Sequence, residues 1–294
     1  MSGLAAHIPP GPPVILCADD FAISESVSAG VQELAAAGRL SAASAMVTFP
    51  EWPELAARLA GLRDRIAIGL HINLTVGAPL GPMPKLTPAG LLPTIGALTL
   101  KGGRGRVDID EIAAEVSRQL AAFQQGTGFS PDFVDGHQHA HVLPGVRKGV
   151  LVALRLAARS VPGLLVRDPA DEIGRITKRG TCLAKAMQVA ALATGFGRAA
   201  RAAGLLTNSG FSGFSDFNTS KPYARELEAG FIAAGPRQLM MCHPGHVDET
   251  LEARDGVTVR REQEFRALMG AEGLTERLWR PDRSRAQLWE TGVV

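Results

Sequence analysis

Three histidines alternate with other residues in the stretch Phe133-Val134-Asp135-Gly136-His137-Gln138-His139-Ala140-His141, and the chain has only seven histidines in all. In a β-strand, residues two apart share one face. The apolar start and the glycine favour a strand that ends at Gly136, with the histidines in the loop at its carboxyl end. Imidazole is the commonest metal ligand and titrates near neutral pH. The stretch therefore predicts a metal or acid–base site, and a loop of solvated histidines is the alternative.

Short apolar runs alternate with helical patterns along the chain. Strands are expected within 14–18, 42–49, 65–75, 164–167 and 238–242, and helices within 25–37, 52–62, 108–125, 144–159, 221–234 and 259–269. This alternation predicts a parallel sheet. The 294 residues, 46% of them hydrophobic, suffice for one (β/α) barrel of roughly 250 residues or for two smaller domains. Because no internal repeat or Pro/Ser linker divides the sequence, we treat residues 1–294 as a single α/β domain.

Three segments do not fit this alternation. Residues 77–106 are rich in Gly and Pro without a clear period, which predicts a loop that closes over a site. Residues 183–203 are rich in Ala but carry charges and two glycines, which predicts a broken helix rather than a membrane span. The tail from Glu272 has Trp279 and Trp289 among charged residues, so we expect it to pack on the outside.

The composition excludes several classes of protein. The net charge is +2 without a basic block, so no nucleic-acid partner is expected. The three cysteines, Cys17, Cys182 and Cys242, are odd in number and form no CxxC pair, which indicates reduced thiols. Residues 1–13 lack the basic start and apolar core of a signal peptide. Together these features predict a cytoplasmic protein without stable membrane insertion.

Polar groups follow the predicted strands, at the point where each strand ends. They are Asp19 and Asp20, His71, the 137–141 histidines, Arg167, and His243. In barrels of parallel strands, sites form at the carboxyl-terminal face from several strand ends. One carboxylate and two imidazoles make a credible catalytic metal site, and a neighbouring carboxylate is then free to act as a base. Taken singly, the aspartates could cap the helix that starts near Ser24, and His71 could be a hydrogen-bonded structural residue.

Four motifs carry a resemblance to a known family. They are Ala18-Asp19-Asp20-Phe21, Gly69-Leu70-His71-Ile72-Asn73-Leu74, Asp135-Gly136-His137-Gln138-His139-Ala140-His141 and His243-Pro244-Gly245. In this order they resemble the YdjC-like family of carbohydrate deacetylases, which includes chito-oligosaccharide deacetylases and hopanoid-biosynthesis-associated deacetylases. The resemblance covers about residues 14–269. It implies a distorted or incomplete TIM-like (β/α) barrel and the metal-dependent removal of acetyl groups from N-acetylated amino sugars, either oligosaccharides or glycolipid-linked sugars.

The resemblance also implies roles for single residues. A divalent metal ion, Mg or Zn, would be held by Asp20, His71 and His137. Asp19 would be the base, as the first aspartate is in the related polysaccharide deacetylases. His243 would be the acid that protonates the leaving amine, and Arg167 would orient the base. His139 and His141 would support the ligands or contact the substrate.

The sequence departs from the family at two places. Ala22 replaces the usual glycine, and a positive φ there would cost an alanine roughly 1 kcal/mol or more. Residues 171–217 match the better-known members poorly, so they are candidates for substrate specificity or for an oligomer contact such as that of a homodimer.

Other functions remain open from the sequence. Metal-dependent phosphoesterases and amidohydrolases also place His-x-His and Asp at barrel strand ends, although amidohydrolases usually carry His-x-His on the first strand, where this chain has Asp19 and Asp20. A non-catalytic sugar- or metal-binding relative that has kept the fold is the alternative from another class.

Overall fold

Parallel β-strands form the centre of the protein. The computed structural model describes residues 6–285 and 287–289. Within them, one eight-stranded sheet has the order β6-β5-β4-β3-β2-β1-β8-β7. Its strands are β1 (Val14–Phe21), β2 (Ala42–Ala45), β3 (Ala67–Ile72), β4 (Phe133–Gly136), β5 (Leu165–Val166), β6 (Leu206–Thr207), β7 (Gly210–Ser212) and β8 (Gln238–Cys242). All of the pairings are parallel, so the carboxyl ends of the strands meet at one end of the sheet.

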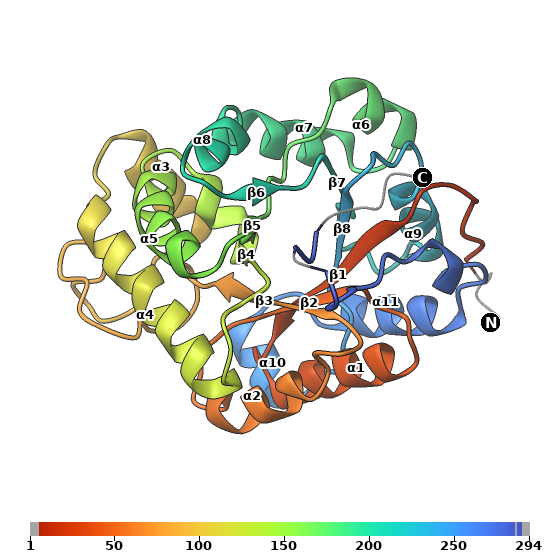
Figure 1. Cartoon of the computed structure of the whole chain (residues 1–294), viewed down its shortest axis with the longest axis horizontal. Helices are drawn as coiled ribbons and strands as arrows, with labels where there is room; N and C mark the ends of the chain where they lie inside the picture. Colours follow the sequence, from red (N-terminus) through yellow and green to blue (C-terminus); the bar gives the residue numbers. More distant parts are fainter. Residues whose placement is uncertain (1–5, 286, 290–294) are drawn as a thin grey trace.

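Helices surround the sheet (Figure 1). They are α1 (Glu25–Ala36), α2 (Trp52–Ala60), α3 (Ile95–Gly103), α4 (Ile109–Thr127), α5 (Val146–Ser160), α6 (Ile173–Arg179), α7 (Leu183–Leu192), α8 (Phe196–Ala202), α9 (Ala224–Gly230), α10 (Glu249–Arg254) and α11 (Val259–Gly270), with the short 3-10 helices η1 (His137–Val142) and η2 (Thr275–Arg277). Local signals set their ends. The Ser24 side chain accepts a hydrogen bond from the Val27 N–H at the start of α1, and Gly128 ends α4 with a φ of 81°.

The sheet curls into a barrel that does not close by strand pairing. Its edge strands are β6 and β7, and no ladder joins them within the described residues. Asn208 lies between them. Its side-chain N–H group donates to the carbonyls of Asp168 and Gly210, at 2.8 Å each, and its side-chain oxygen accepts the Asp168 N–H. The predicted distorted or incomplete (β/α) barrel is therefore confirmed.

Alternate residues of the strands pack on opposite faces, as the period of a strand requires. On β1, Leu16 belongs to the large cluster under the helices, whereas Ile15 and Cys17 belong to a smaller cluster inside the curl. Trp289 joins this inner cluster, with its ring 6.0 Å from that of Phe133, and is 3% exposed. The expectation that the tail packs on the outside is thus wrong for Trp289, because the Phe133 ring at the start of β4 offers apolar surface that an aromatic ring can cover.

Two of the irregular segments contain more structure than the sequence indicated. Residues 77–106 include α3, which begins where Thr94 accepts the Ala97 N–H and buries Leu98. Residues 171–217 contain α6, α7, α8, β6 and β7, and the predicted break in the Ala-rich helix falls between α7 and α8, at Gly195 with a φ of 80°. In the described part of the chain, none of the helices has both the length and the apolar character needed to cross a bilayer.

Candidate active site

The two aspartates at the end of β1 face different partners because the backbone turns between them. Asp20 has a φ of 66° and Ala22 a φ of 69°, and the register of β1 against β2 shifts between Ala18 and Phe21. Asp19 continues the inward face of Ile15 and Cys17. The left-handed conformation of Asp20 allows its carboxylate to reach the ends of β3 and β4. The position of Ala22 does require a positive φ, as the departure from the family pattern suggested.

Asp20, His71 and His137 meet at the carboxyl ends of β1, β3 and β4. Asp20 Oδ1 lies 3.2 Å from His71 Nε2 and 2.8 Å from His137 Nδ1, and all three side chains are buried. Ligand atoms from the three residues lie within 4.8 Å of one another. His137 Nε2 is buried and has no partner among the described residues. One carboxylate and two imidazoles are a donor set that can hold a divalent cation, and the mixed N/O chemistry suits zinc better than magnesium.

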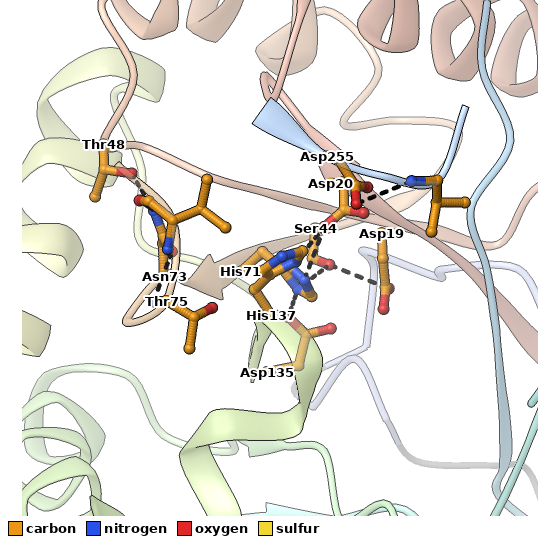
Figure 2. Close-up of polar contacts among 12 residues, drawn as sticks. Asp19, Asp20, Ser44, Thr48, His71, Asn73, Thr75, Asp135, His137 and Asp255 are labelled. Atoms are coloured by element: carbon orange, nitrogen blue, oxygen red, sulfur yellow. Dashed lines mark hydrogen bonds and ion pairs between the residues drawn. The ribbon is translucent and has the colours of Figure 1, made fainter. Parts of the chain in front are cut away.

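His71 is held in one orientation by a carboxylate on its far side. Asp135 Oδ1 lies 2.6 Å from His71 Nδ1, and Figure 2 shows the imidazole between Asp135 and Asp20. In the neutral ring, a proton on Nδ1 would leave Nε2 as the lone-pair nitrogen that faces Asp20. Burial lowers the pKa of His71, but the charges of Asp135 and Asp19 outweigh burial and raise the pKa to about 10. A cation that binds here therefore has to displace a proton.

Arg167 forms ion pairs with both Asp19 and Asp135, next to the cluster of Asp20, His71 and His137. Its Nη1 and Nη2 each donate to one oxygen of Asp19, both at 2.6 Å, and Nη2 also lies 2.5 Å from Asp135 Oδ2. Burial raises the pKa of Asp19, but the Arg167 guanidinium outweighs it and holds the pKa well below its usual range. Cys17, Asp19 and Asp135 also lie close enough together to suggest a second cation site. The guanidinium already supplies the positive charge there, so we do not assign a metal to that group.

His243 follows β8 and faces the aspartates from the other side of the site. Its backbone N–H donates to Glu264 Oε2 at 2.6 Å, and its ring packs edge-on against Phe217. Burial lowers the pKa of His243 to about 4, against the opposing effect of Asp20 and Asp19. The imidazole is therefore neutral at pH 7 before any substrate binds.

His139 and His141 take different places. The His139 ring packs edge-on against Phe211 and Phe214, and the residue lines the cavity described below. His141 is fully buried and donates from Nε2 to the Arg167 carbonyl at 2.9 Å. Its ring lies so close to Gly136 that a Cβ on that glycine would meet Nδ1 at 2.8 Å. His141 thus supports the ends of β4 and β5 from behind.

A cavity of about 880 Å³ adjoins the cluster. Its polar floor consists of Asp19, Asp20, His137, His243, Asp255 and Arg261. Its aliphatic wall consists of Ile95 and Leu100 from α3, Val142 and Leu143 near η1, and Val189 and Leu192 from α7. Among the described residues that line the cavity, Phe217 is the one aromatic residue besides the histidines.

The structure adds contacts that sequence reasoning missed. Asp135 lies inside the histidine motif, but nothing in its spacing indicates that it bonds both His71 and Arg167. Ser44 Oγ lies 3.1 Å from His71 Nδ1. Arg261, on α11, donates to Asp20 Oδ2 at 2.7 Å although 241 positions separate the two residues. No strand-end signal marks Arg261, since its position depends on how α11 is rotated against the barrel.

Comparison with known proteins places these motifs in context. Residues 13–275 match the YdjC-like protein family. The chain is similar to a chitooligosaccharide deacetylase of Klebsiella pneumoniae (strain 342), with 29% identity over 241 residues that cover 81% of this chain and 83% of the relative. It is also similar to a carbohydrate deacetylase of Homo sapiens, with 37% identity over 138 residues that cover 45% of this chain and 42% of that protein.

Among solved structures, the fold resembles that of an Enterococcus faecalis V583 protein described as a putative cellobiose-phosphate cleavage protein. The TM-score is 0.66 at 21% identity, with 91% of this chain and 94% of the other covered. At this identity the similarity concerns the fold.

Proposed function

Because the chain belongs to the YdjC-like protein family, we propose that it is a metal-dependent hydrolase that removes the acetyl group from an N-acetylated amino sugar. The observation that carries the proposal is the buried cluster of Asp20, His71 and His137, which lies beside Asp19 and His243 at one cavity. The relatives named as carbohydrate deacetylases support the same reaction.

Asp20, His71 and His137 are the residues that would hold the cation. When bound, a divalent cation supplies Lewis-acid chemistry, since it polarises a carbonyl and makes water more acidic. His137 Nδ1 and His71 Nε2 both lie within 3.2 Å of Asp20 Oδ1, so these three atoms converge on one point and fit this role. Zinc is the cation that the donor set favours, and magnesium is the alternative.

Asp19 is the proposed base for the attacking water. Arg167 bonds both oxygens of Asp19, so the carboxylate stays ionised and keeps one direction towards the cavity. The same ion pair weakens Asp19 as a base. Asp19 would therefore take a proton only from a water more acidic than bulk water, and a bound cation would supply that acidity.

His243 is the proposed acid. The reaction forms a C–O bond to the acetyl carbon and breaks the C–N bond, and the departing nitrogen needs a proton because an amine anion is a poor leaving group. His243 starts as a neutral ring, since burial lowers its pKa to about 4. The proton that it gives to nitrogen is therefore the one that leaves the water, passed on within the site.

The cavity favours a glycolipid-linked sugar over a free oligosaccharide as the substrate. Sugar rings are commonly bound by polar groups and aromatic faces, whereas six aliphatic side chains line this cavity beside its polar floor and Phe217 is its one aromatic residue besides the histidines. Leu100 on that wall is 54% exposed, so an apolar group beside the sugar would cover it at a gain of about 25 cal/mol per Å². The wall residues Val189 and Leu192 come from the 171–217 region, which makes that region a determinant of specificity.

Acetate release tests the proposal. Octyl N-acetylglucosaminide and N,N′-diacetylchitobiose would be compared, with octyl glucoside as the control that lacks an acetamide. Each reaction would be run before and after removal of metal with a chelator, and after addition of zinc or magnesium. We expect acetate that disappears on chelation, returns with zinc, and forms faster from the octyl glycoside.

Two results would change the assignment. Faster release from the chitobiose would assign a free oligosaccharide to the cavity. No acetate from either sugar, with zinc still bound, would reject the deacetylase. Turnover of a phosphate ester would then favour another barrel hydrolase, and its absence would favour a non-catalytic binding protein.

A further inference from the structure

A buried arginine from α11 reaches the polar floor. The side chain of Arg261 is 0% exposed. Its Nη2 donates to Asp20 Oδ2 at 2.7 Å and to Asp255 Oδ2 at 2.5 Å, and its Nε donates to the Val257 carbonyl at 2.9 Å. Three acceptors from two segments therefore fix the guanidinium in one position.

This contact divides the two oxygens of Asp20 between different partners. Oδ1 faces the nitrogens of His71 and His137, whereas Oδ2 is occupied by Arg261. A carboxylate can bind a cation through one oxygen or through both. With Oδ2 held by a charge-assisted hydrogen bond, Oδ1 is the oxygen that remains for a cation.

Asp255 limits how far Arg261 neutralises Asp20. The same Nη2 bonds both carboxylates, so Asp20 does not receive the whole charge of the guanidinium. Asp255 is itself fixed, because its Oδ1 accepts the Val257 N–H at 3.1 Å. The arrangement holds Asp20 firmly and leaves Oδ1 with negative charge for a ligand bond.

We propose that Arg261 is a positioning residue that presents a single oxygen of Asp20 to the cation. The proposal rests on the cation site of the proposed function and extends it to a residue that touches no predicted ligand except Asp20. The simpler reading is that Arg261 only anchors α11 to the barrel. That reading predicts a loss of stability without a change in the choice or strength of metal binding.

Arg260 offers a matched control for this distinction. It is the neighbouring residue on α11, is 1% exposed, and pairs with Glu226 at 2.6 Å. Its hydrogen-bond partners are Asn218, Lys221, Gln263 and Glu226, and none of these four belongs to the floor. Arg260→Met therefore removes a buried, ion-paired arginine from the same helix without touching Asp20.

The test is a titration of the full metal-free chain with zinc and with manganese, alongside thermal unfolding. We expect Arg261→Met to weaken zinc binding by about 10- to 100-fold, the range seen when partners of metal ligands are removed. Freed from Arg261, Asp20 can use both oxygens, so zinc should lose more affinity than manganese. Arg261→Lys keeps one donor for Oδ2 and should recover part of the loss. Arg260→Met should lower the unfolding temperature while zinc affinity stays within about threefold of wild type.

Several outcomes would overturn the proposal. One is a zinc affinity equal to that of wild type in Arg261→Met, provided that this variant folds. If it does not fold, Arg261→Lys takes its place: wild-type zinc affinity and an unchanged ratio of zinc to manganese affinity in that variant would also overturn the proposal. An equal loss in Arg260→Met, or no zinc binding by the wild-type chain, would also reject it. The deacetylase assignment can fail separately. If the protein releases no acetate but its zinc binding still depends on Arg261, this inference stands and only the proposed reaction is rejected.

Discussion

The polar floor and the aliphatic wall of the cavity are built in different ways. The floor comes mainly from strand ends, and its charged groups are tied by short contacts such as the 2.6 Å bonds of Asp19 to Arg167 and the 2.7 Å bond of Asp20 to Arg261. The wall comes largely from α3 and α7, which lie in segments inserted between strands and helices of the barrel. Its side chains make no polar contacts, and Leu100 remains half exposed.

This difference separates chemistry from recognition. A reacting group has to be placed within a fraction of an ångström, which a buried network on a sheet can provide. A surface that only excludes water from an apolar group tolerates looser packing. We therefore expect changes in the floor to alter turnover or stability strongly, and changes in the wall to alter substrate preference modestly.

The largest expected effect is in the floor, from Asp19→Asn. Loss of the proposed base should lower kcat by about 10²- to 10⁴-fold while the metal content stays near that of wild type, because Asp19 is not among the proposed ligands. Acetate release and elemental analysis measure the two quantities. Asp132→Asn is the matched control. Both oxygens of Asp132 also pair with an arginine, at 3.0 and 2.9 Å from Arg283, but Asp132 precedes β4 and so lies at the opposite end of the sheet. Turnover within threefold of wild type in Asp19→Asn would favour a different base or a non-catalytic relative.

The second effect concerns how the free energy of unfolding changes at acid pH, through His141, which lies behind the floor. Burial lowers the pKa of His141 to about 4 from its ordinary value near 6.5, so the unfolded chain binds a proton there between these pH values and the folded chain does not. The free energy of unfolding should thus fall as pH drops from about 6.5 to 4. His141→Gln should remove up to about 3 kcal/mol of that fall, because a shift of one pKa unit corresponds to 1.36 kcal/mol.

Urea unfolding of metal-free protein at pH 7, 5.5 and 4.5 measures this difference. His243 contributes in the same direction, so some of the fall should persist in the variant. His7, whose side chain is 77% exposed, provides the control substitution His7→Gln. Equal slopes with pH in wild type and His141→Gln would contradict the assignment of a buried neutral ring.

The third effect compares one glycine behind the floor with one on the wall. Gly136→Ala should cost about 1–3 kcal/mol, because the new Cβ meets the His141 ring at 2.8 Å and the surrounding network has no room to move. Gly96→Ala, on α3, should be neutral or stabilising by up to about 1 kcal/mol, since its Cβ meets nothing within 4 Å. Urea denaturation at pH 7 measures both. Similar costs at the two glycines would mean that the wall is packed as tightly as the floor.

The smallest effect is expected on the wall itself. Leu100→Ala removes three carbons from a half-exposed side chain, so kcat/KM for the octyl glycoside should fall by about fivefold, roughly 1 kcal/mol. The value for diacetylchitobiose should stay unchanged. Leu91→Ala is the control, because Leu91 is 64% exposed and lies outside the cavity lining. Equal losses for both substrates would indicate that Leu100 contacts the sugar rather than an apolar group.

The same contrast explains what the sequence could predict. Asp20, His71 and His137 stand where apolar runs end at the same edge of a parallel sheet, so the pattern predicted that they lie near one another with the other strand-end groups. The resemblance to the YdjC-like family singled out these three as a set. Their roles as metal ligands stay a prediction, as do those of Asp19, Arg167 and His243 in catalysis. The β/α alternation predicted the parallel sheet, and the resemblance to the YdjC-like family implied the distorted barrel.

What the sequence could not predict depends on tertiary packing. Helix α3 has glycines at 96, 102 and 103, which hide its helical pattern, and it forms where Gly102 lies tightly against the Pro144 carbonyl. Which of two adjacent arginines on α11 faces Asp20 depends on the rotation of that helix. The burial of Trp289 depends on its contact with Phe133, 156 positions away, which no local pattern reveals.

The gap between β6 and β7 gives the barrel an adjustable circumference. A closed ring of strands has a diameter fixed by its strand number and stagger. Here no strand ladder closes the ring among the described residues, and the Asn208 side chain instead bonds the carbonyls of Asp168, which follows β5, and of Gly210 in β7. Residues can be lost or gained between β6 and β7 without breaking the strand pairing of β6 with β5 or of β7 with β8. Changes in a few residues around Asn208 should therefore be accommodated at this seam, while the five strand ends that carry the proposed acid–base and ligand groups keep their spacing.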